Sequence, residues 1–360
     1  LLNWEKVTGK AVIPINSSVP RVFDPCIWKK DNIYYSLSGG TLPDKYTGIR
    51  TRADFLLRSR DLKNWEYLHP FIEGDRFTRL GDDGACPYFW PIGDRHILLF
   101  FSHMSGGQSL LGDYDKERDK FVVTSHHEFN FGACRPGGIH APSATPNGKG
   151  SVNVIFNMNE AYPTKGWNRN MCLPRKLTLI GKDELGIEPL GDIESLRRNH
   201  QHLDRVSLPA NEEVVLENIE GDSIELMAEI ETNNAPMVEL NVLRSPDKEE
   251  KTRIVFYRER GFRNRERYSG WDGKRVRKAK DSIITIDSSY SSKLANVQSR
   301  PPETAPVYLQ EEEPLQLRVF VDKSVVEVFV NGKQCVAMRV YPGSQDSIGV
   351  SLRSQGRDAL

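Results

Sequence analysis

The stretch LRVFVDKSVVEVFVNG at residues 317–332 decides the fold class of the C-terminal half. Apolar and polar residues alternate on both sides of Asp-Lys-Ser, which predicts two antiparallel strands joined by a tight turn. The closing Asn331-Gly332 pair is one that hairpin turns favour. We therefore expect a β-hairpin here, and the stretch indicates fold rather than chemistry.

Similar short runs rich in Val, Ile, Phe, Tyr and Leu recur along the chain, bounded by Gly, Asp, Asn and Pro, and these are strand signals. Long segments of helical periodicity are absent from the sequence, and the best helix candidate is the short piece 192–200. The protein is therefore predicted to be all-β. The predicted strands are residues 33–37, 55–58, 96–101, 151–156, 224–230, 239–242, 253–257, 282–286, 315–321, 325–330 and 334–340.

The two halves of the chain differ in pattern, which predicts two domains. In residues 1–203, aromatic strands, turns and phrases such as 60–65 recur loosely, as in the four-stranded blades of a β-propeller. Residues 204–360 alternate more regularly, which favours a β-sandwich. The polar segment 198–208 is expected to link the halves, and residues 299–306 are expected to form a long connection between strands.

Composition excludes several function classes. The 360 residues carry 49 Lys plus Arg and 49 Asp plus Glu, so no net field favours nucleic acid as a partner. The locally basic stretch 257–280 is expected to be a solvated hairpin. No apolar run reaches the ~20 residues of a membrane span. Five scattered cysteines without paired spacing predict neither a disulfide framework nor a zinc site, and no metal or other cofactor is expected.

An Asp-Pro dipeptide at 24–25 precedes the predicted strand 33–37. Because proline restricts itself and the residue before it, Asp24 is expected to present its carboxylate from a fixed, extended turn. A carboxylate held in this way can accept sugar hydroxyls, although an Asp-Pro turn can also simply begin a strand.

The stretch DDGACPYFWP at 82–91 places two acids and a glycine ahead of three aromatics. Aromatic faces beside carboxylates suit a sugar. Tyr88 and Trp90 carry polar groups that can be used at a wet site, so they are predicted to contact substrate. Phe89 is expected to fill the core of a blade.

A third group follows the predicted strand 151–156. Glu160 ends this segment and Trp167 lies shortly after it, as expected at the rim of a sugar pocket. His103 follows another predicted strand and joins the predicted substrate-binding set. A solvated strand end for Glu160 and a structural, hydrogen-bonded role for His103 are the alternatives.

Taken in order, these segments resemble glycoside hydrolase family 32, the invertase, inulinase and levanase group. Val-Phe-Asp-Pro is similar to the family's Phe-Arg-Asp-Pro motif, and Ala-Cys-Pro-Tyr-Phe-Trp-Pro to its Glu-Cys-Pro-Asp-Phe-Phe-Pro motif. Two later segments resemble the last-blade signature and the sandwich signature. The matching residues are 22–25, 85–91, 156–175 and 325–342.

The resemblance implies a five-bladed β-propeller followed by a β-sandwich, and a retaining mechanism on fructosyl bonds. In such a mechanism one carboxylate attacks the anomeric carbon and a second donates and then accepts a proton, with the two groups about 5 Å apart. A third carboxylate stabilises the transition state, and Asp24 matches this third group. The partner implied is a saccharide, and a secreted or periplasmic protein is compatible with the resemblance; no signal peptide is recognisable.

The chain departs from the family's pattern at its proton donor. Ala85 stands where the acid/base glutamate is expected, and Phe23 replaces the arginine before Asp24. Asp83 or Asp82 is predicted to substitute for the missing acid, since both lie on the adjoining turn.

The family's nucleophile lies in an Asn-Asp-Pro motif that does not occur in this sequence. We expect the N-terminal part of the propeller to be truncated, or supplied by a second copy in a homo-oligomer. Three functions stay open: a glycosidase with altered acid/base chemistry, a carbohydrate-binding family member without catalysis, and a related propeller glycosidase acting on arabinose- or xylose-containing glycans.

Overall fold

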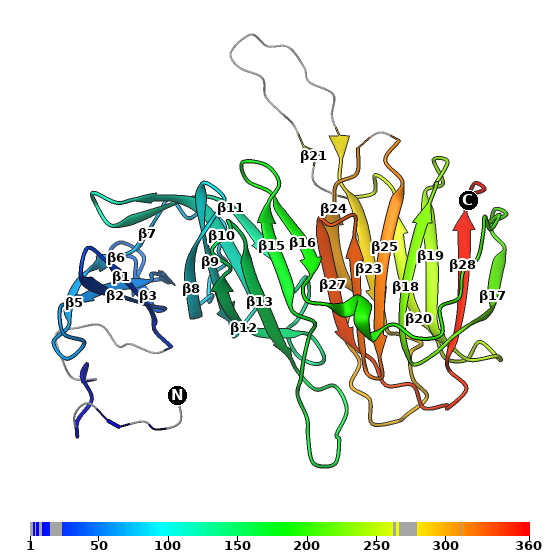
Figure 1. Ribbon diagram of the computed structural model, residues 1–360, viewed down its shortest axis with the longest axis horizontal. Coiled ribbons are helices and arrows are strands. Elements are labelled where there is room, and N and C mark those ends of the chain that lie inside the picture. Colours follow the sequence, from blue (N-terminus) through cyan, green and yellow to red (C-terminus); the bar gives the residue numbers. More distant parts are fainter. Residues whose placement is uncertain are drawn as a thin grey trace, which may run out of the picture. The chain divides into compact units, whose positions relative to one another are not determined.

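The computed structural model (Figure 1) describes Asn3 and residues 5–6, 9–14, 24–261, 264–265, 279–310 and 312–360. Phe23 and most of the basic stretch 257–280 lie outside the described residues. The described parts are almost entirely strands and loops, as predicted. Their only helical element is a 3-10 turn at Ile193–Leu196, which lies within the helix candidate 192–200.

The chain divides into two compact units. The first comprises Leu1–Glu128, His140–Ile155 and Thr178–Leu185; the second comprises Phe129–Ile139, Phe156–Leu177 and Gly186–Leu360. Each unit is described separately below.

The first unit contains two complete sheets whose main strands follow one another in sequence order. The first sheet runs β1 (Cys26–Lys30), β2 (Ile33–Ser38), β5 (Phe55–Ser59) and β6 (Glu66–Pro70). The second runs β8 (Ala85–Ile92), β9 (Arg95–Ser102), β10 (Gly106–Asp115) and β11 (Lys120–Glu128), and β7 (Ile72–Glu73) joins β11 in parallel. A small hairpin pairs β3 (Thr41–Pro43) with β4 (Arg50–Arg52). Four-stranded meanders of this kind are the blades of a β-propeller.

A third sheet has the same plan. It runs β12 (Ile139–Pro146), β13 (Val152–Met158), β15 (Arg175–Leu179) and β16 (Leu185–Pro189), and β14 (Asn170–Met171) pairs with β13. The boundary between the two units passes through this sheet. The described residues therefore form three blade-like sheets, compared with the five that the family resemblance implies.

Aromatic side chains fill the core of the first unit. Phe71, Phe89 and Phe121 are almost fully buried, and their ring centroids lie 4.9–6.1 Å apart. Trp28 packs against two of these rings, at 5.6 Å from Phe89 and 6.1 Å from Phe71. The prediction that Phe89 fills a blade core is confirmed.

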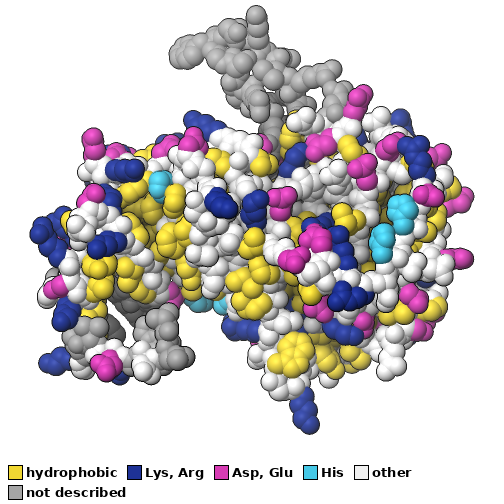
Figure 2. Space-filling view, in the orientation of Figure 1, with side chains coloured by type: hydrophobic (Ala, Val, Ile, Leu, Met, Phe, Trp, Pro, Cys, Tyr) yellow, Lys and Arg dark blue, Asp and Glu magenta, His cyan; other side chains and the backbone are white. Residues whose placement is uncertain are grey.

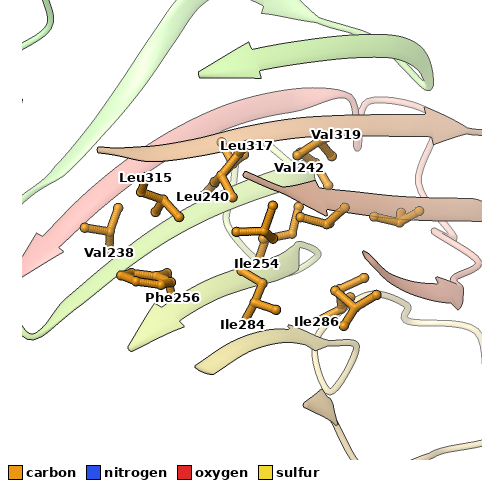
Figure 3. Packing of buried hydrophobic residues seen from close by; sticks show 14 of the residues in the cluster. Val238, Leu240, Val242, Ile254, Phe256, Ile284, Ile286, Leu315, Leu317 and Val319 are labelled. Carbon is orange, nitrogen blue, oxygen red and sulfur yellow. The ribbon is translucent and has the colours of Figure 1, made fainter. Parts of the chain in front are cut away.

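The second unit contains a β-sandwich. One sheet runs β17 (Glu213–Glu220), β28 (Gly349–Gln355), β19 (Met237–Arg244), β20 (Thr252–Tyr257), β23 (Ser282–Asp287) and β24 (Glu303–Val307). The other runs β18 (Ser223–Ile230), β25 (Leu315–Asp322), β26 (Val325–Val330) and β27 (Gln334–Arg339). Figure 3 shows the apolar core between the sheets, where Leu240 and Ile254 of the first face Leu317 of the second.

The hairpin predicted at residues 317–332 is present in the second unit. Asp322 pairs with Val325 across a two-residue turn between β25 and β26. Asn331 and Gly332 have φ values of 49° and 61° in the next turn, the left-handed geometry expected of an Asn-Gly hairpin.

Every predicted strand range overlaps an observed strand. The predicted connection at 299–306 needs correction, because residues 303–306 belong to β24.

Charged side chains of both signs are interspersed over the face shown in Figure 2, which agrees with the balanced composition. Among the described residues, no helix has the length and apolar character needed to span a bilayer. In the same residues, no three His, Cys, Asp or Glu side chains are grouped so as to hold a metal ion.

Candidate active site

Asp24 lies at a bend just before β1 and has a φ of 50°. The extended backbone predicted for this residue was wrong, since the residue adopts the left-handed conformation that aspartate tolerates better than most residues. Its side chain is exposed, and Cys86 Sγ lies 3.6 Å from its Oδ2. The Asp-Pro and Cys-Pro segments, 62 residues apart in sequence, therefore meet in the first unit.

A β-bulge in β8 points Cys86 toward Asp24. Ala85 pairs with Phe101 and Tyr88 with Leu99, so β8 contains one more residue than β9 over this interval. Cys86 has a φ of 50° at the bulge. Such bulges redirect side chains and are common beside active sites.

The Cys86 thiol is a neutral hydrogen-bond donor rather than a reactive thiolate. Burial, together with the negative charges of Asp24 and Asp83, raises its pKa to about 11. The thiol therefore stays protonated near neutral pH and can donate a weak hydrogen bond to Asp24.

Ala85 itself is only 2% exposed and begins β8. Its methyl group carries no proton to transfer. The turn before it, residues 82–84, offers two carboxylates directly ahead of Ala85 in sequence.

A buried ion pair supports this turn. Arg52 and Asp54 form a bidentate contact with N–O distances of 2.6 and 3.2 Å, and both side chains are at most 1% exposed. Gly84 has a φ of 66°, and a Cβ added there would lie 2.7 Å from Arg52 Nε and from Asp54 Oδ1. A Cβ at Gly39 would meet the Gly84 carbonyl oxygen at 2.1 Å. Glycine is needed at both positions because the backbone packs so closely.

Asp82 holds the turn in place from inside. Its carboxylate accepts hydrogen bonds from Ser105 Oγ at 2.6 Å and from the Arg79 backbone N–H at 2.7 Å. Burial alone would raise the pKa of Asp82, but hydrogen bonds from Ser102, Ser105 and the Arg79 backbone outweigh it, and the pKa is lowered. Asp82 is therefore ionised and stabilises the turn. An ionised carboxylate carries no proton, so Asp82 is poorly suited to act as a general acid.

Asp83 lies nearer the surface and pairs with a histidine. Its Oδ2 lies 2.7 Å from Nδ1 of His103, and its Oδ1 accepts the His103 backbone N–H at 3.3 Å. The His103 side chain is 68% exposed and lies 5.0 Å, centroid to centroid, from Phe101, the cross-strand partner of Ala85. Asp83 and His103 thus adjoin the position of the missing glutamate.

Tyr88 and Trp90 lie on β8 and are half-buried. The Trp90 indole donates a hydrogen bond to the Ala144 carbonyl oxygen at 3.2 Å, and its ring packs against the aromatic core. Among the residues that the structure describes, no comparable contact positions Tyr88.

Glu160 and Trp167 belong to the second unit. The Arg169 guanidinium lies 3.6 Å from Glu160 Oε2, and Trp167 is 48% exposed. Arg339 lies 5.1 Å from the Trp167 ring centroid and 5.2 Å from that of Tyr341, so it lies beside both aromatic rings. This arrangement leaves an exposed indole beside charged groups, as at many sugar-binding surfaces.

Sequence reasoning missed Arg52, Asp54 and Arg339. The Arg-x-Asp spacing at 52–54 places two opposite charges on one side of an extended segment. This pattern could have predicted the ion pair between Arg52 and Asp54. The sequence alone does not place Arg339 beside Trp167, because Trp167 comes from a distant part of the chain.

Comparison with known proteins matches nearly the whole chain to one family. The sequence profile of the glycosyl hydrolases family 32 N-terminal domain matches residues 2–189, and that of the family 32 C-terminal domain matches residues 192–359. A sucrose-6-phosphate hydrolase of Zymomonas mobilis is 25% identical over 372 residues, which cover 95% of this chain and 64% of the relative. The chain thus spans about two thirds of that relative's length.

Solved structures show the same fold. Fructan 1-exohydrolase IIa of Cichorium intybus, a variant in complex with 1-kestose, superposes with a TM-score of 0.75 at 18% identity, over 96% of this chain and 73% of its own. A variant of the Bombyx mori family 32 β-fructofuranosidase in complex with sucrose superposes with a TM-score of 0.67 at 19% identity. The superposition covers 99% of this chain and 68% of the other. These structures are a β-propeller followed by a β-sandwich. On its sequence and its fold, the chain belongs to glycoside hydrolase family 32.

Proposed function

We propose that this protein binds a fructofuranosyl group at Asp24 and acts on fructofuranosides as an O-glycosyl hydrolase. The observation that carries the proposal is the 3.6 Å contact between the Asp24 carboxylate and the Cys86 thiol, directly beside Ala85. Two of the segments by which the sequence resembles the family, 22–25 and 85–91, therefore lie next to each other, and this contact supports the proposal of a shared site.

Asp24 has the chemistry that such a site needs. An exposed carboxylate can accept two sugar hydroxyls, and its negative charge stabilises the positive charge that develops at the anomeric carbon in an oxocarbenium-like transition state. The Cys86 thiol donates to the same carboxylate and therefore helps to fix its orientation.

The relatives support the sugar class. By their names, they hydrolyse sucrose 6-phosphate or were crystallised with 1-kestose or sucrose, all of which carry a fructofuranosyl group. An enzyme for arabinose- or xylose-containing glycans fits less well, because the chain also matches the family's C-terminal domain.

Isothermal titration calorimetry with sucrose, 1-kestose and free fructose tests binding. We expect saturable heats with at least one fructose-containing sugar and their loss in Asp24→Asn, which keeps the shape of the side chain and removes its charge. Glucose and xylobiose are the control ligands. Equal binding of all of these sugars, or none by any, contradicts the proposal.

The second candidate is a carbohydrate-binding protein without catalysis. Ala85 favours it, because a methyl group stands where the acid/base carboxylate is expected, and Asp82 is held in its ionised form. Release of fructose from sucrose or 1-kestose by the full-length protein, measured by chromatography, separates the candidates. Binding without any release favours this second function.

A further inference from the structure

We propose that His103, oriented by Asp83, is the proton donor that replaces the glutamate missing at Ala85. The inference rests on the proposed hydrolase function and deepens it by assigning the group that protonates the leaving oxygen. Asp83 is a positioning residue in this arrangement, and the imidazole is the group that reaches the substrate.

The geometry of the pair is that of an oriented imidazole. Asp83 holds His103 by two contacts, one to Nδ1 at 2.7 Å and one to the backbone N–H at 3.3 Å. A carboxylate at Nδ1 fixes the ring orientation, which leaves Nε2 directed away from the carboxylate. The ring is 68% exposed, so a substrate can approach it.

The location follows from strand register. Ala85 lies opposite Phe101 on neighbouring strands, so their side chains share one face of the sheet. His103 lies two residues beyond Phe101, on the turn after β9, and its ring contacts the Phe101 ring at 5.0 Å. This ring contact places His103 beside Phe101, the residue that lies opposite Ala85.

The turn that carries His103 is rigid. The Ser102 hydroxyl accepts the backbone N–H groups of Met104 and Ser105, and the Ser105 hydroxyl donates to the buried Asp82. A proton donor has to be held within hydrogen-bond reach of the reacting atom, and a fixed turn provides this better than a mobile loop.

Several titratable groups surround His103. Asp83 contacts it directly, and beyond Asp83 lie Cys86 and Asp24. His140 lies against the same Phe101 ring, at 4.0 Å.

The proposed step is balanced as follows. A water molecule attacks the anomeric carbon as the bond from that carbon to the glycosidic oxygen breaks, and the departing oxygen keeps the electron pair and takes the Nε2 proton. The attacking water then gives up one proton to the solvent, and the neutral imidazole regains a proton from the solvent.

Leaving-group dependence tests the proposal in the full-length protein. Sucrose needs a proton on its leaving oxygen, whereas 4-nitrophenyl β-D-fructofuranoside releases a phenolate that needs little help. We expect His103→Gln to lower kcat on sucrose by about 10²–10⁴-fold, the usual contribution of a general acid, and to affect the nitrophenyl substrate much less. Asp83→Asn is expected to lower kcat on sucrose to a smaller extent and to change the alkaline side of the pH–rate profile.

His69→Gln is the control, because His69 lies on β6 and contacts the Pro70 carbonyl oxygen rather than the site. Equal losses on both substrates, an unchanged pH profile in Asp83→Asn, or sugar binding without any turnover would overturn the role of His103. Loss of sugar binding in the unmodified protein would instead overturn the proposed function, so the two failures can be told apart.

Discussion

Two buried arginine–carboxylate pairs stabilise different kinds of structure in the two units. Arg52 and Asp54 are two residues apart and lie beneath the Gly84 turn beside the candidate site. Arg175 and Glu327 are 152 residues apart and connect β15 to β26. Both pairs are at most 1% exposed, so the difference lies in what each one positions: a functional turn in the first unit, and a connection between strands in the second.

This comparison predicts that damage to the two pairs will have different functional consequences. A buried charge that loses its partner is costly in either place. Only the pair under the turn should also control sugar binding.

The largest stability effect is expected for Glu327→Gln. The change leaves Arg175 charged and buried, and weakens the hydrogen bond that Glu327 accepts from the Leu173 backbone N–H at 2.6 Å. We expect a loss of about 3–5 kcal/mol, measured by calorimetric unfolding, with sugar affinity unchanged below the transition. Glu66→Gln removes a surface pair with Arg58 and is the control, expected to change stability by less than ~1 kcal/mol. A similar small effect for Glu327→Gln would contradict the prediction.

Asp54→Asn breaks the other pair. Arg52 keeps its stacking on the Phe100 ring, at 3.6 Å from its centroid, so we expect a smaller loss of about 3 kcal/mol. Because the Gly84 turn packs on this pair, sugar affinity should fall together with stability. Retained affinity in folded Asp54→Asn protein would show that the two pairs have the same role.

Asp82→Asn tests whether the Asp82 carboxylate stabilises the turn beside the candidate site. The amide keeps one acceptor oxygen but loses the charge that strengthens the bonds from Ser105 and the Arg79 backbone. The expected loss is about 1–3 kcal/mol, the cost of weakening buried hydrogen bonds to a charged group. Hydrogen exchange should show faster opening at residues 79–84, and protection equal to that of the unmodified protein would argue against the anchoring role.

How far the sequence predicted this molecule depends on the region. Alternation and turn residues predicted the sandwich strands because a half-buried sheet imposes a period of two on its sequence. The site depends instead on left-handed backbone at Asp24 and Cys86, and on a bulge after Ala85. These features arise from packing between distant segments, and no local pattern specifies them.

The same limit applies to the site residues. The sequence named Asp24, Asp83 and His103 singly, and only the structure shows that Asp83 contacts His103 and that Cys86 contacts Asp24. The sequence alone could not distinguish the roles of Asp82 and Asp83. These roles depend on hydrogen bonds from Ser105 and His103, which lie twenty or more positions away.

The smallest predicted effect concerns acid stability of the sandwich. Burial raises the pKa of Glu213, but hydrogen bonds from Arg244, Lys248 and Ser351 outweigh this and lower it from 4.5 to about 2. A carboxyl group with a depressed folded-state pKa stabilises the fold above its unfolded pKa, and this contribution is lost as the pH falls from about 4.5 toward 2. In urea unfolding, the difference between the unmodified protein and Glu213→Gln should shrink over this range. A difference that does not change with pH would contradict the assignment.

The central claim is that the carboxylate of Asp24, held beside Cys86, recognises a fructofuranosyl group. Calorimetric titration of 1-kestose into the unmodified protein and into Asp24→Asn, with Glu327→Gln measured at a temperature where it stays folded, tests this most directly. We predict saturable binding by the unmodified protein and by Glu327→Gln, and at least a hundredfold weaker binding by Asp24→Asn, about 2.7 kcal/mol. Equal affinity in Asp24→Asn and the unmodified protein would contradict the account.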